Sequence, residues 1–223
     1  MGDNPVILDG EKELPSVGRI RQKNEEIILQ AAEEEFALFG FKGASMQKIA
    51  DRAELPKANL HYYFKNKLGL YTAVLRQVIE LWDNTLNDLT PEHDPAIVLP
   101  HYIREKIHFA KAYPLASRLF AKEIISGAPQ LQEYFSDGYQ VWFDQRTAVF
   151  QSWIDQGKMD PIDPAHLIFL LWSSTQHYAD FAVQIESALG SHPLSDGHYD
   201  SATDTLIHII LKGCGVRFPT ATV

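Results

Sequence analysis

The feature that most constrains the fold is a helical spacing of apolar residues that runs through most of the chain. In the segment 67–89 the apolar positions recur three and four residues apart, at Tyr71, Val74, Leu75, Val78, Ile79 and Trp82. No run of alternating β-branched residues is long enough to propose a sheet. The 223 residues are enough to bury a sizeable core. The sequence therefore predicts an all-α protein.

Proline, glycine and capping residues divide this pattern into separate helices. Asp94 and Asp163 each precede a proline, which is typical of a helix N-terminus, and Asn66 is a further capping residue. Gly40 is expected to end the first helix. Residues 1–18 carry no periodicity and are expected to be disordered. The expected helices cover 20–39, 46–53, a short segment opened by Pro56, 67–89, 95–112, 114–126, 128 or 129 to 156, 164–189 and 199–213.

Charge is distributed unevenly along the chain. The formal net charge is −9 at pH 7, yet residues 40–67 carry six bases and two acids, while residues 73–223 carry ten bases and eighteen acids. Arg19, Arg21 and Lys23 extend the basic region upstream. Phosphate responds to the nearby field rather than to the sum of charges. Nucleic acid is therefore an expected partner.

The cysteine content and the N-terminus indicate a cellular compartment. Cys214 is the only cysteine, so no intrachain disulfide is possible and a reducing compartment is expected. The first residues have early acids and no apolar core, so they do not form a signal peptide. The longest apolar run, 167–172, is too short to cross a bilayer. We therefore expect a soluble cytoplasmic protein.

Two short helices, 46–53 and the one opened by Pro56, follow a longer helix closely enough to form a helix-turn-helix. Leu60 and Phe64 point inward, which leaves the other face of the third helix free to enter a DNA major groove. Lysine reaches phosphate or guanine, asparagine pairs with adenine, and tyrosine and histidine reach phosphate or sugar. The alternative is a generic helical domain whose aromatic side chains pack inside. The expected DNA-contacting residues are Ser45, Gln47, Lys57, Ala58, Asn59, His61, Tyr62, Tyr63, Lys65 and Lys67.

The helix 164–189 has polar residues within its apolar stripe, namely Thr175 and Gln176. A buried amide without a partner costs about 1–3 kcal/mol, so Gln176 needs another helix, the mate of a dimer or a small ligand. Trp172 lies one turn away. An indole beside an amide suits a small planar heterocycle that carries C=O and N–H edges.

Other kinds of site have little support. His177 and Asp180 form either a simple pair or part of a metal site, but no second cluster shows ligand spacing, so no metal is expected. No G-x-S-x-G, H-E-x-x-H, C-x-x-C, P-loop or G-x-G-x-x-G motif occurs, which argues against an enzyme. An architectural DNA protein is a further alternative, against which the acidic body and Gln176 argue. No cofactor is expected.

The N-terminal region resembles the DNA-binding domain of the TetR family of bacterial repressors. The residues that carry the resemblance are Phe36, Gly40, Ala44–Ser45, Ile49–Ala50, Ala53, Leu60, Tyr63–Phe64 and Lys67. The resemblance implies an all-helical homodimer with two domains. After the expected disordered tail at 1–18, we expect the DNA-binding domain at 19–66 and the ligand-binding and dimerisation domain at 67–223. The turn departs from the family pattern, with Glu54 in place of glycine and Pro56 in place of serine.

The C-terminal region resembles the pyrimidine-responsive branch of that family. The matching segments are AVLRQVIELW at 73–82, YPLASRLFAKEIISGAP at 113–129, SWIDQGKMDPIDP at 152–164 and HLIFLLWSSTQHYADFAVQIE at 166–186. The resemblance implies a repressor of pyrimidine-utilisation genes that binds a palindromic operator and senses uracil, thymine or a related pyrimidine. A regulator with a different planar or amphipathic effector is the alternative. The implied ligand contacts are Trp82, Trp172 and Gln176, with Gln77, Thr175 and Tyr178 as further candidates.

The helix 67–89 is the expected link between the two domains, because it begins where the reading helix ends and carries Trp82 toward the C-terminal body. A ligand that moves this helix changes the separation of two reading helices in a dimer, which must fit half-sites about 34–36 Å apart. The helices 164–189 and 199–213 are long and apolar enough to form a four-helix dimer interface.

Overall fold

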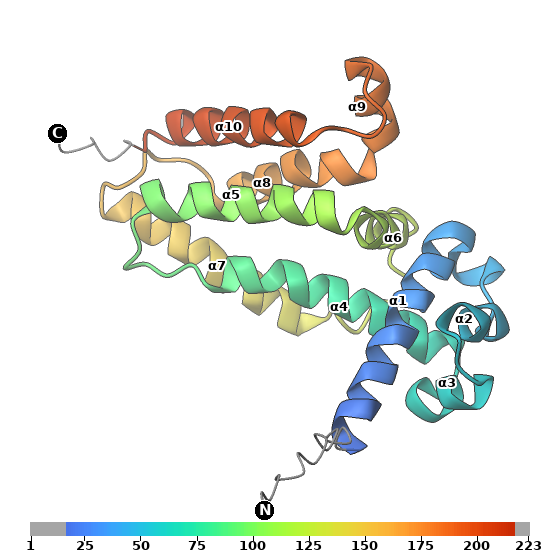
Figure 1. The fold of residues 1–223 in the computed structure, drawn as a ribbon. Coiled ribbons are helices and arrows are strands. Elements are labelled where there is room, and N and C mark those ends of the chain that lie inside the picture. The colour runs from blue at the N-terminus through green and yellow to red at the C-terminus, as the bar shows by residue number, and fades with distance from the viewer. Residues whose placement is uncertain (1–16, 217–223) are drawn as a thin grey trace, which may run out of the picture.

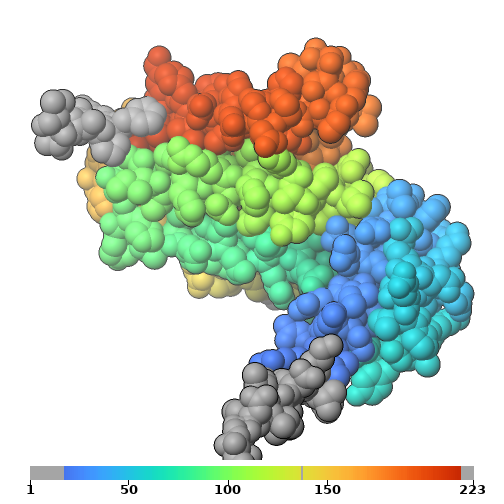
Figure 2. Space-filling model, viewed as in Figure 1, coloured from blue at the N-terminus to red at the C-terminus, as the bar shows by residue number. Residues whose placement is uncertain are grey.

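The computed structural model describes residues 17–216, and these residues form ten α-helices joined by turns, without a strand. A small lobe made of α1–α3, the head, is joined by α4 to a larger body made of α5–α10 (Figures 1 and 2). This arrangement confirms the all-α prediction. The helices are α1 (Val17–Gly43), α2 (Met46–Ala53), α3 (Lys57–Phe64), α4 (Lys67–Asn87), α5 (Pro95–Ala112), α6 (Pro114–Ile125), α7 (Asp137–Asp155), α8 (Pro164–Asp180), α9 (Ala182–Leu189) and α10 (Asp196–Gly213).

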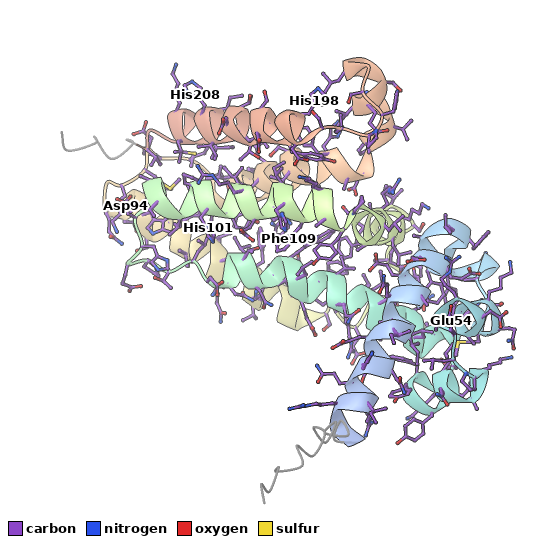
Figure 3. The ribbon with its side chains drawn as sticks, viewed as in Figure 1. Glu54, Asp94, His101, Phe109, His198 and His208 are labelled. Carbon is purple, nitrogen blue, oxygen red and sulfur yellow. The ribbon has the colours of Figure 1, made fainter. Side chains whose placement is uncertain are left out.

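Side-chain caps fix several helix starts at the expected places. The Asn66 carboxamide oxygen accepts a hydrogen bond from the Gly69 amide at 2.8 Å, which starts α4. The Asp94 carboxylate accepts from the Ala96 amide at 2.9 Å and starts α5 (Figure 3). Such caps satisfy amides that have no partner within the helix.

The first helix is longer than expected. It begins at Val17, inside the segment 1–18, whose first 16 residues lie outside the described residues. Gly40 interrupts the helix, as expected, with a φ of 67° and a ψ of 174°, but one further turn follows as far as Gly43. A positive φ is accessible to glycine without strain, so the interruption occurs at this residue.

Two expected helices in the body have different bounds. The helix expected from 128 or 129 begins only at Asp137, because Gly127 and Ala128 adopt positive φ angles of 88° and 52° and the chain turns there. The helix expected at 164–189 is broken at Phe181, where φ is −115° and ψ is 27°, so α8 and α9 are separate.

The last helix also differs from the expectation, since it starts three residues before 199. Ser195 and His198 form a reciprocal capping box that begins α10 at Asp196 (Figure 3). No helix within residues 17–216 is long and apolar enough to cross a bilayer.

Two clusters of buried side chains hold the molecule together, and α4 belongs to both. The head cluster includes Ile28, Ile49 and Leu60, and the body cluster includes Trp153 and Leu171. The head cluster also contains side chains from the first half of α4 and from the turn that follows α6. The head therefore shares its core with one end of the body.

Candidate functional site

The turn between α2 and α3 keeps a left-handed geometry although it lacks glycine. Glu54 has a φ of 54° and a ψ of 34°, and its amide faces the carbonyls of Ala50 and Asp51 (Figure 3). A left-handed conformation costs a residue with a Cβ about 1–2 kcal/mol. Pro56 caps α3 without a side-chain bond, and its carbonyl accepts from the Asn59 amide at 2.8 Å. The helix-turn-helix geometry is thus reached with Glu and Pro at the two unusual positions.

The outer face of α3 presents polar and basic side chains to solvent. Leu60 is fully buried and holds the helix to the head. Tyr62 is 68% exposed, so its ring lies mostly in solvent. Lys57, Ala58, His61 and Lys65 are exposed as well, and Asn59 is partly buried. These residues occupy the face expected to contact DNA.

Three predicted DNA contacts are engaged within the head. Tyr63 is half-buried and packs against the head cluster, so its ring does not point outward as expected. The Lys67 ammonium donates to the Ala44 carbonyl at 3.0 Å and lies 4.8 Å from the Phe41 ring centroid. The His61 Nδ1 lies 2.9 Å from the Lys65 carbonyl oxygen. The contacts of Tyr63 and Lys67 join residues from different elements, so spacing along the chain could not reveal them.

The start of α2 provides a second group of polar atoms. The Ser45 hydroxyl accepts from the Lys48 amide at 3.2 Å, which confirms Ser45 as the N-cap. Gln47 is exposed and donates to the Asp51 carboxylate at 2.8 Å. A helix N-terminus with free amides favours phosphate, so this end of α2 suits the DNA backbone.

A cavity of about 240 Å³ lies in the body between α4, α5, α6 and α8. Three of the predicted ligand contacts, Trp82, Trp172 and Gln176, line this same cavity. Its volume lies below the 300–1,000 Å³ range typical of drug-sized ligands, so it suits a small molecule. The remaining lining residues are Ile79, Asp83, Leu86, Lys106, Phe120, Ile124, Tyr134, Phe135 and Tyr139.

The other three predicted ligand contacts lie elsewhere. Gln77 is exposed and lines a separate surface groove beside α1 and α4. Thr175 is fully buried, and its hydroxyl donates to the Leu171 carbonyl at 2.7 Å. The Tyr178 ring faces the Tyr199 ring on α10, with centroids 6.4 Å apart. The structure therefore does not bring these three residues to the cavity.

Lys106 also lines the cavity, although the sequence did not predict it as a ligand contact. Its side chain is 3% exposed, and its ammonium lies 4.6 Å from the Trp82 ring centroid. Burial lowers the pKa of Lys106 to about 7, while the nearby Asp83 and Asp180 carboxylates oppose that shift. The sequence did contain a sign of this burial, because Lys106 lies three residues after Ile103, on the apolar face of α5.

Asp83 adds a carboxylate to the same cavity. One of its oxygens accepts from the Tyr134 hydroxyl at 2.9 Å. Burial raises the pKa of Asp83, against the opposing effects of that hydrogen bond and of Lys106. The cavity thus combines a cation, a carboxylate and the amide of Gln176 among aromatic rings. Such a set of groups can bind a small ring through both its donors and its acceptors.

One segment, residues 114–136, connects this cavity to the head. Phe120 and Ile124 line the cavity, whereas Leu119 and Leu131 belong to the head cluster. Glu123, on the same helix as Phe120, is buried; its carboxylate accepts from the Tyr71 hydroxyl at 2.9 Å and from the Gln130 amide at 2.7 Å. The two sides of a single segment therefore contact the ligand cavity and the head.

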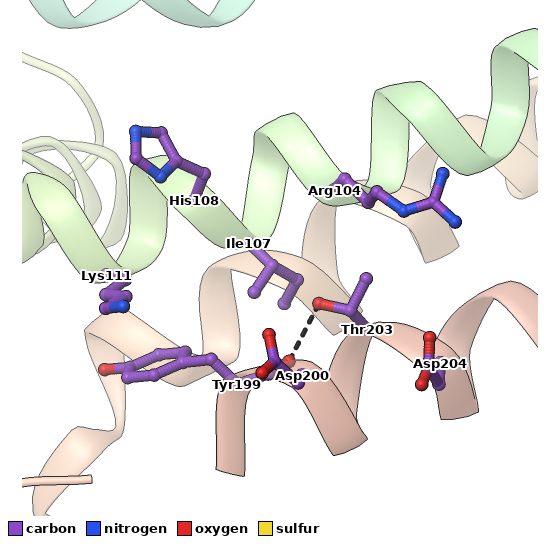
Figure 4. A pocket seen from close by; sticks show the side chains of 8 residues that line it. All are labelled: Arg104, Ile107, His108, Lys111, Tyr199, Asp200, Thr203 and Asp204. Carbon is purple, nitrogen blue, oxygen red and sulfur yellow. Dashed lines mark hydrogen bonds between the residues drawn. The ribbon is translucent and has the colours of Figure 1, made fainter. Parts of the chain in front are cut away.

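A larger groove of about 490 Å³ lies between α5 and α10 (Figure 4). Its walls carry exposed Arg104 and His108 on one side and exposed Asp200 and Asp204 on the other. No buried polar group points into it among the described residues. Exposed charges of this kind are well solvated, so the smaller cavity is the better candidate for an effector. Within residues 17–216 no cluster of His, Cys, Asp and Glu is arranged to hold a metal ion.

Two family models match adjacent parts of the chain. Residues 28–74 match the family described as bacterial regulatory proteins, tetR family, and residues 75–217 match the family described as YcdC-like protein, C-terminal region. The second match spans more than half of the chain. The chain therefore belongs to the TetR family of bacterial transcriptional regulators.

Individual relatives agree with this assignment. The chain is 40% identical over 190 residues to the HTH-type transcriptional regulator RutR of Escherichia coli strain K12, covering 85% of this chain and 90% of that protein. It is 25% identical over 149 residues to the uncharacterized HTH-type transcriptional regulator YhgD of Bacillus subtilis, covering 65% of this chain and 76% of that protein. These relatives are named as regulators and not as enzymes.

Solved structures show the same fold. A transcriptional regulator from Streptomyces coelicolor, SCO4942, aligns with a TM-score of 0.68 and 22% identity over 87% of this chain and 99% of that chain. HlyIIR, a hemolysin II transcriptional regulator, aligns with a TM-score of 0.60 and 23% identity over 88% of this chain and 99% of that chain. At such low identity these likenesses concern the fold alone.

Proposed function

We propose that the protein is a homodimeric repressor whose affinity for a palindromic operator changes when a pyrimidine such as uracil or thymine enters the body cavity. The observation that carries the proposal is the convergence of Trp82, Trp172, Gln176 and Lys106 on one small cavity that is joined to the head. The protein would act in the cytoplasm, where a bacterial operator lies, and would control genes of pyrimidine utilisation.

DNA reading is assigned to α3 and to the start of α2. The exposed Lys57 and Lys65 suit phosphate or guanine, and Asn59 suits an adenine edge. Tyr62 is largely exposed, so its hydroxyl is available to backbone phosphate or sugar. The Ser45 end of α2 would bind a phosphate through its amides. Tyr63 and Lys67 support the head rather than contact DNA, because their side chains are already engaged.

The chemistry of the cavity supports a pyrimidine. A uracil ring has C=O acceptors and N–H donors at its edges and two flat faces. Gln176 offers both a donor and an acceptor, Lys106 a donor, and Asp83 an acceptor. The indoles of Trp82 and Trp172 supply flat apolar surface beside them. The similarity to the pyrimidine-responsive branch points to the same class of ligand.

The dimer is assigned to α8 and α10. Both helices expose large apolar side chains that a monomer would leave in water, including Phe169, Leu170 and Ile209. Exposed apolar surface of this kind is typical of a protein interface. Two such helices from each protomer would form a four-helix contact around a two-fold axis. The two-fold axis would then match that of a palindromic operator.

The coupling between cavity and head is assigned to the segment 114–136 together with α4. A ligand that contacts Phe120 or Ile124 would favour one position of α6. Glu123 would pass that preference to Tyr71, whose ring packs against Phe36 in the head. A ligand that prefers one position of this segment shifts the population of head positions and thereby the affinity for DNA.

Calorimetric titration with uracil, thymine and dihydrouracil tests the proposal. We expect uracil or thymine to bind one site per protomer, and Gln176→Leu to weaken that binding at least about tenfold, as expected when a hydrogen-bonded polar contact is lost. Gln145→Leu, at an exposed position of α7, serves as the matched control and should bind normally. If no pyrimidine binds the unmodified protein, the effector belongs to another class of planar or amphipathic molecule.

A further inference from the structure

The first turns of α1 extend beyond the core of the head. No side chain between Gly18 and Ile27 is fully buried; Ile27 packs partly buried against the head cluster, and Ile28 is the first fully buried residue of that cluster. At about 1.5 Å per residue, the helix begins its course about 15 Å before Ile28. This projection, residues 18–27, buries little apolar surface and therefore adds little to the stability of the head.

The charges on the projection oppose the stability of the helix. Arg19, Arg21 and Lys23 are exposed, and no acidic residue lies between positions 18 and 24. Cations near a helix N-terminus are unfavourable, because the exposed amides there carry partial positive charge. Arg19 and Lys23 also lie four residues apart, where like charges repel. Within residues 17–216 none of the three forms an ion pair. A negatively charged partner would offset these unfavourable contacts.

The projection lies beside the reading helix. The Arg21 guanidinium is 5.9 Å from the centroid of the Tyr62 ring, which belongs to the outer face of α3. In Figure 1 the N-terminal turns of α1 run toward the same end of the head as α3. A cation above an aromatic ring is attracted to it, so this contact holds the projection against the reading helix. Any DNA that approaches Tyr62 also approaches Arg21.

We propose that residues 18–27 of α1 form a second DNA contact, which binds the phosphate backbone flanking the groove that α3 enters. This contact rests on the DNA-binding part of the proposed function and is independent of the effector. Arg21 bridges the two contacts through Tyr62, while Arg19 and Lys23 extend the basic surface along the helix. The partner is the sugar–phosphate backbone rather than base edges, so the contact adds affinity without reading sequence.

A comparison of two duplex lengths tests this contact. The operator is selected by the protein from a random pool, and binding is measured to the selected site with and without flanking base pairs at several salt concentrations. The test variant is Arg19→Gln/Arg21→Gln/Lys23→Gln. We expect the unmodified protein to lose affinity when the flanks are removed and the variant to bind both duplexes equally. The slope of log affinity against log salt should fall by up to about 2.7 per protomer for three phosphate contacts.

The matched control removes three exposed cations from the body, as Arg76→Gln/Arg104→Gln/Lys212→Gln. This control should keep both the flank dependence and most of the salt slope. Circular dichroism checks that the test variant keeps its helical content and melting temperature. Equal flank dependence and equal salt slope in the test variant and the unmodified protein would overturn the proposal.

A separate variant, Lys57→Gln, distinguishes this idea from the reading function of α3. If Lys57→Gln weakens binding while the α1 variant does not, the α1 contact is wrong and the α3 assignment stands. If the α1 variant weakens binding while Lys57→Gln does not, the α1 contact stands and the assignment of Lys57 is wrong.

Discussion

The head and the body place their charged groups in opposite surroundings. Lys57 on α3 and Lys65 directly after it lie in water, whereas Lys106 in the body is 3% exposed and lies against the Trp82 ring. Exposed charges act on phosphate through a field that salt screens. Buried charges instead acquire shifted pKa values. The head should therefore respond mainly to ionic strength, and the cavity mainly to pH and to the shape of its ligand.

The largest expected effect is on effector binding by Lys106→Met. Removing the buried ammonium deletes a donor from the cavity, so the affinity for uracil should fall about 10- to 100-fold, as when a charged hydrogen bond is lost. Operator affinity without effector should stay within about twofold, because Lys106 is remote from α3. Calorimetry and fluorescence anisotropy provide the two measurements. If Lys106→Met lost operator affinity to a similar extent, Lys106 would affect DNA binding as well as effector binding.

The second effect concerns stability and pH. In the folded protein the pKa of Lys106 is about 7, below its ordinary value of 10.5, so the unfolded chain binds more protons between those values. The burial penalty is thus greatest below pH 7 and declines as pH rises toward 10.5. Lys106→Met should therefore stabilise the protein most below pH 7, and the gain should shrink by at most about 1.4 kcal/mol per pH unit above it.

Denaturant unfolding of both proteins between about pH 6 and pH 9 measures this difference. Lys111→Met is the control, because Lys111 is exposed on the same helix and its pKa is raised by the hydrogen bond to Asp196. Its stability difference from the unmodified protein should stay constant over the same range. A constant difference for Lys106→Met as well would contradict the assigned effect of burial.

On the head, Lys57→Ala should weaken operator binding about tenfold, corresponding to the 1–3 kcal/mol typical of a direct DNA contact. The salt slope should fall by about 0.9 per protomer if Lys57 contacts phosphate. Gel-shift titrations across several salt concentrations measure both quantities. An unchanged binding curve at every salt concentration would remove Lys57 from the interface.

A smaller effect should come from Tyr71→Phe, which removes the hydrogen bond to Glu123. We expect operator and uracil affinities to change little separately, whereas the ratio of operator affinities with and without saturating uracil should fall several-fold. Coupling free energies of 1–3 kcal/mol are typical, so a partial loss is measurable. Tyr199→Phe is the control on α10 and should keep the full ratio. If Tyr71→Phe also keeps it, Glu123 does not transmit the signal.

The smallest expected effect is on stability by Glu54→Gly. Glycine adopts the observed φ of 54° without steric strain, so the variant should be more stable by roughly 1 kcal/mol. Asp51→Gly, within the regular turns of α2, should be less stable by about 0.3 kcal/mol, because glycine is a somewhat poorer helix former than aspartate. Thermal unfolding compares the two variants. Equal destabilisation by both substitutions would mean that the turn carries no strain at position 54.

The sequence best predicted the structural features that depend on residues close together in the chain. The caps at Asn66 and Asp94 and the inward Leu60 followed from local chemistry, and the structure confirms them. The late start of α7 and the break at Phe181 were missed, because tertiary packing and not local propensity decides where a continuous apolar pattern bends. The sequence pattern also did not indicate that the chain turns at residue 128 instead of beginning a helix there.

The candidate cavity shows the same limit. Trp172 and Gln176 were predicted from the interrupted apolar stripe and again by the family resemblance, and Trp82 by the resemblance alone; the structure brings all three to one cavity. Lys106 and Asp83 were missed, since charged residues are normally read as solvated unless a neighbour on another helix reveals their burial. Thr175 is next to Gln176 on α8, but adjacent positions of a helix point about 100° apart, and the Thr175 hydroxyl donates to the Leu171 carbonyl instead of facing the cavity.

Helix α4 contributes side chains to both hydrophobic clusters, and this limits which parts can be exchanged between related regulators. A head cut after residue 66 would lose Leu70 and Val74, which are almost fully buried in its core. It would also lose Leu131, which packs into the head cluster from the turn that follows α6. A transplantable DNA-binding unit therefore has to include α4 and the segment 114–136, so operator preference cannot be exchanged without part of the sensor.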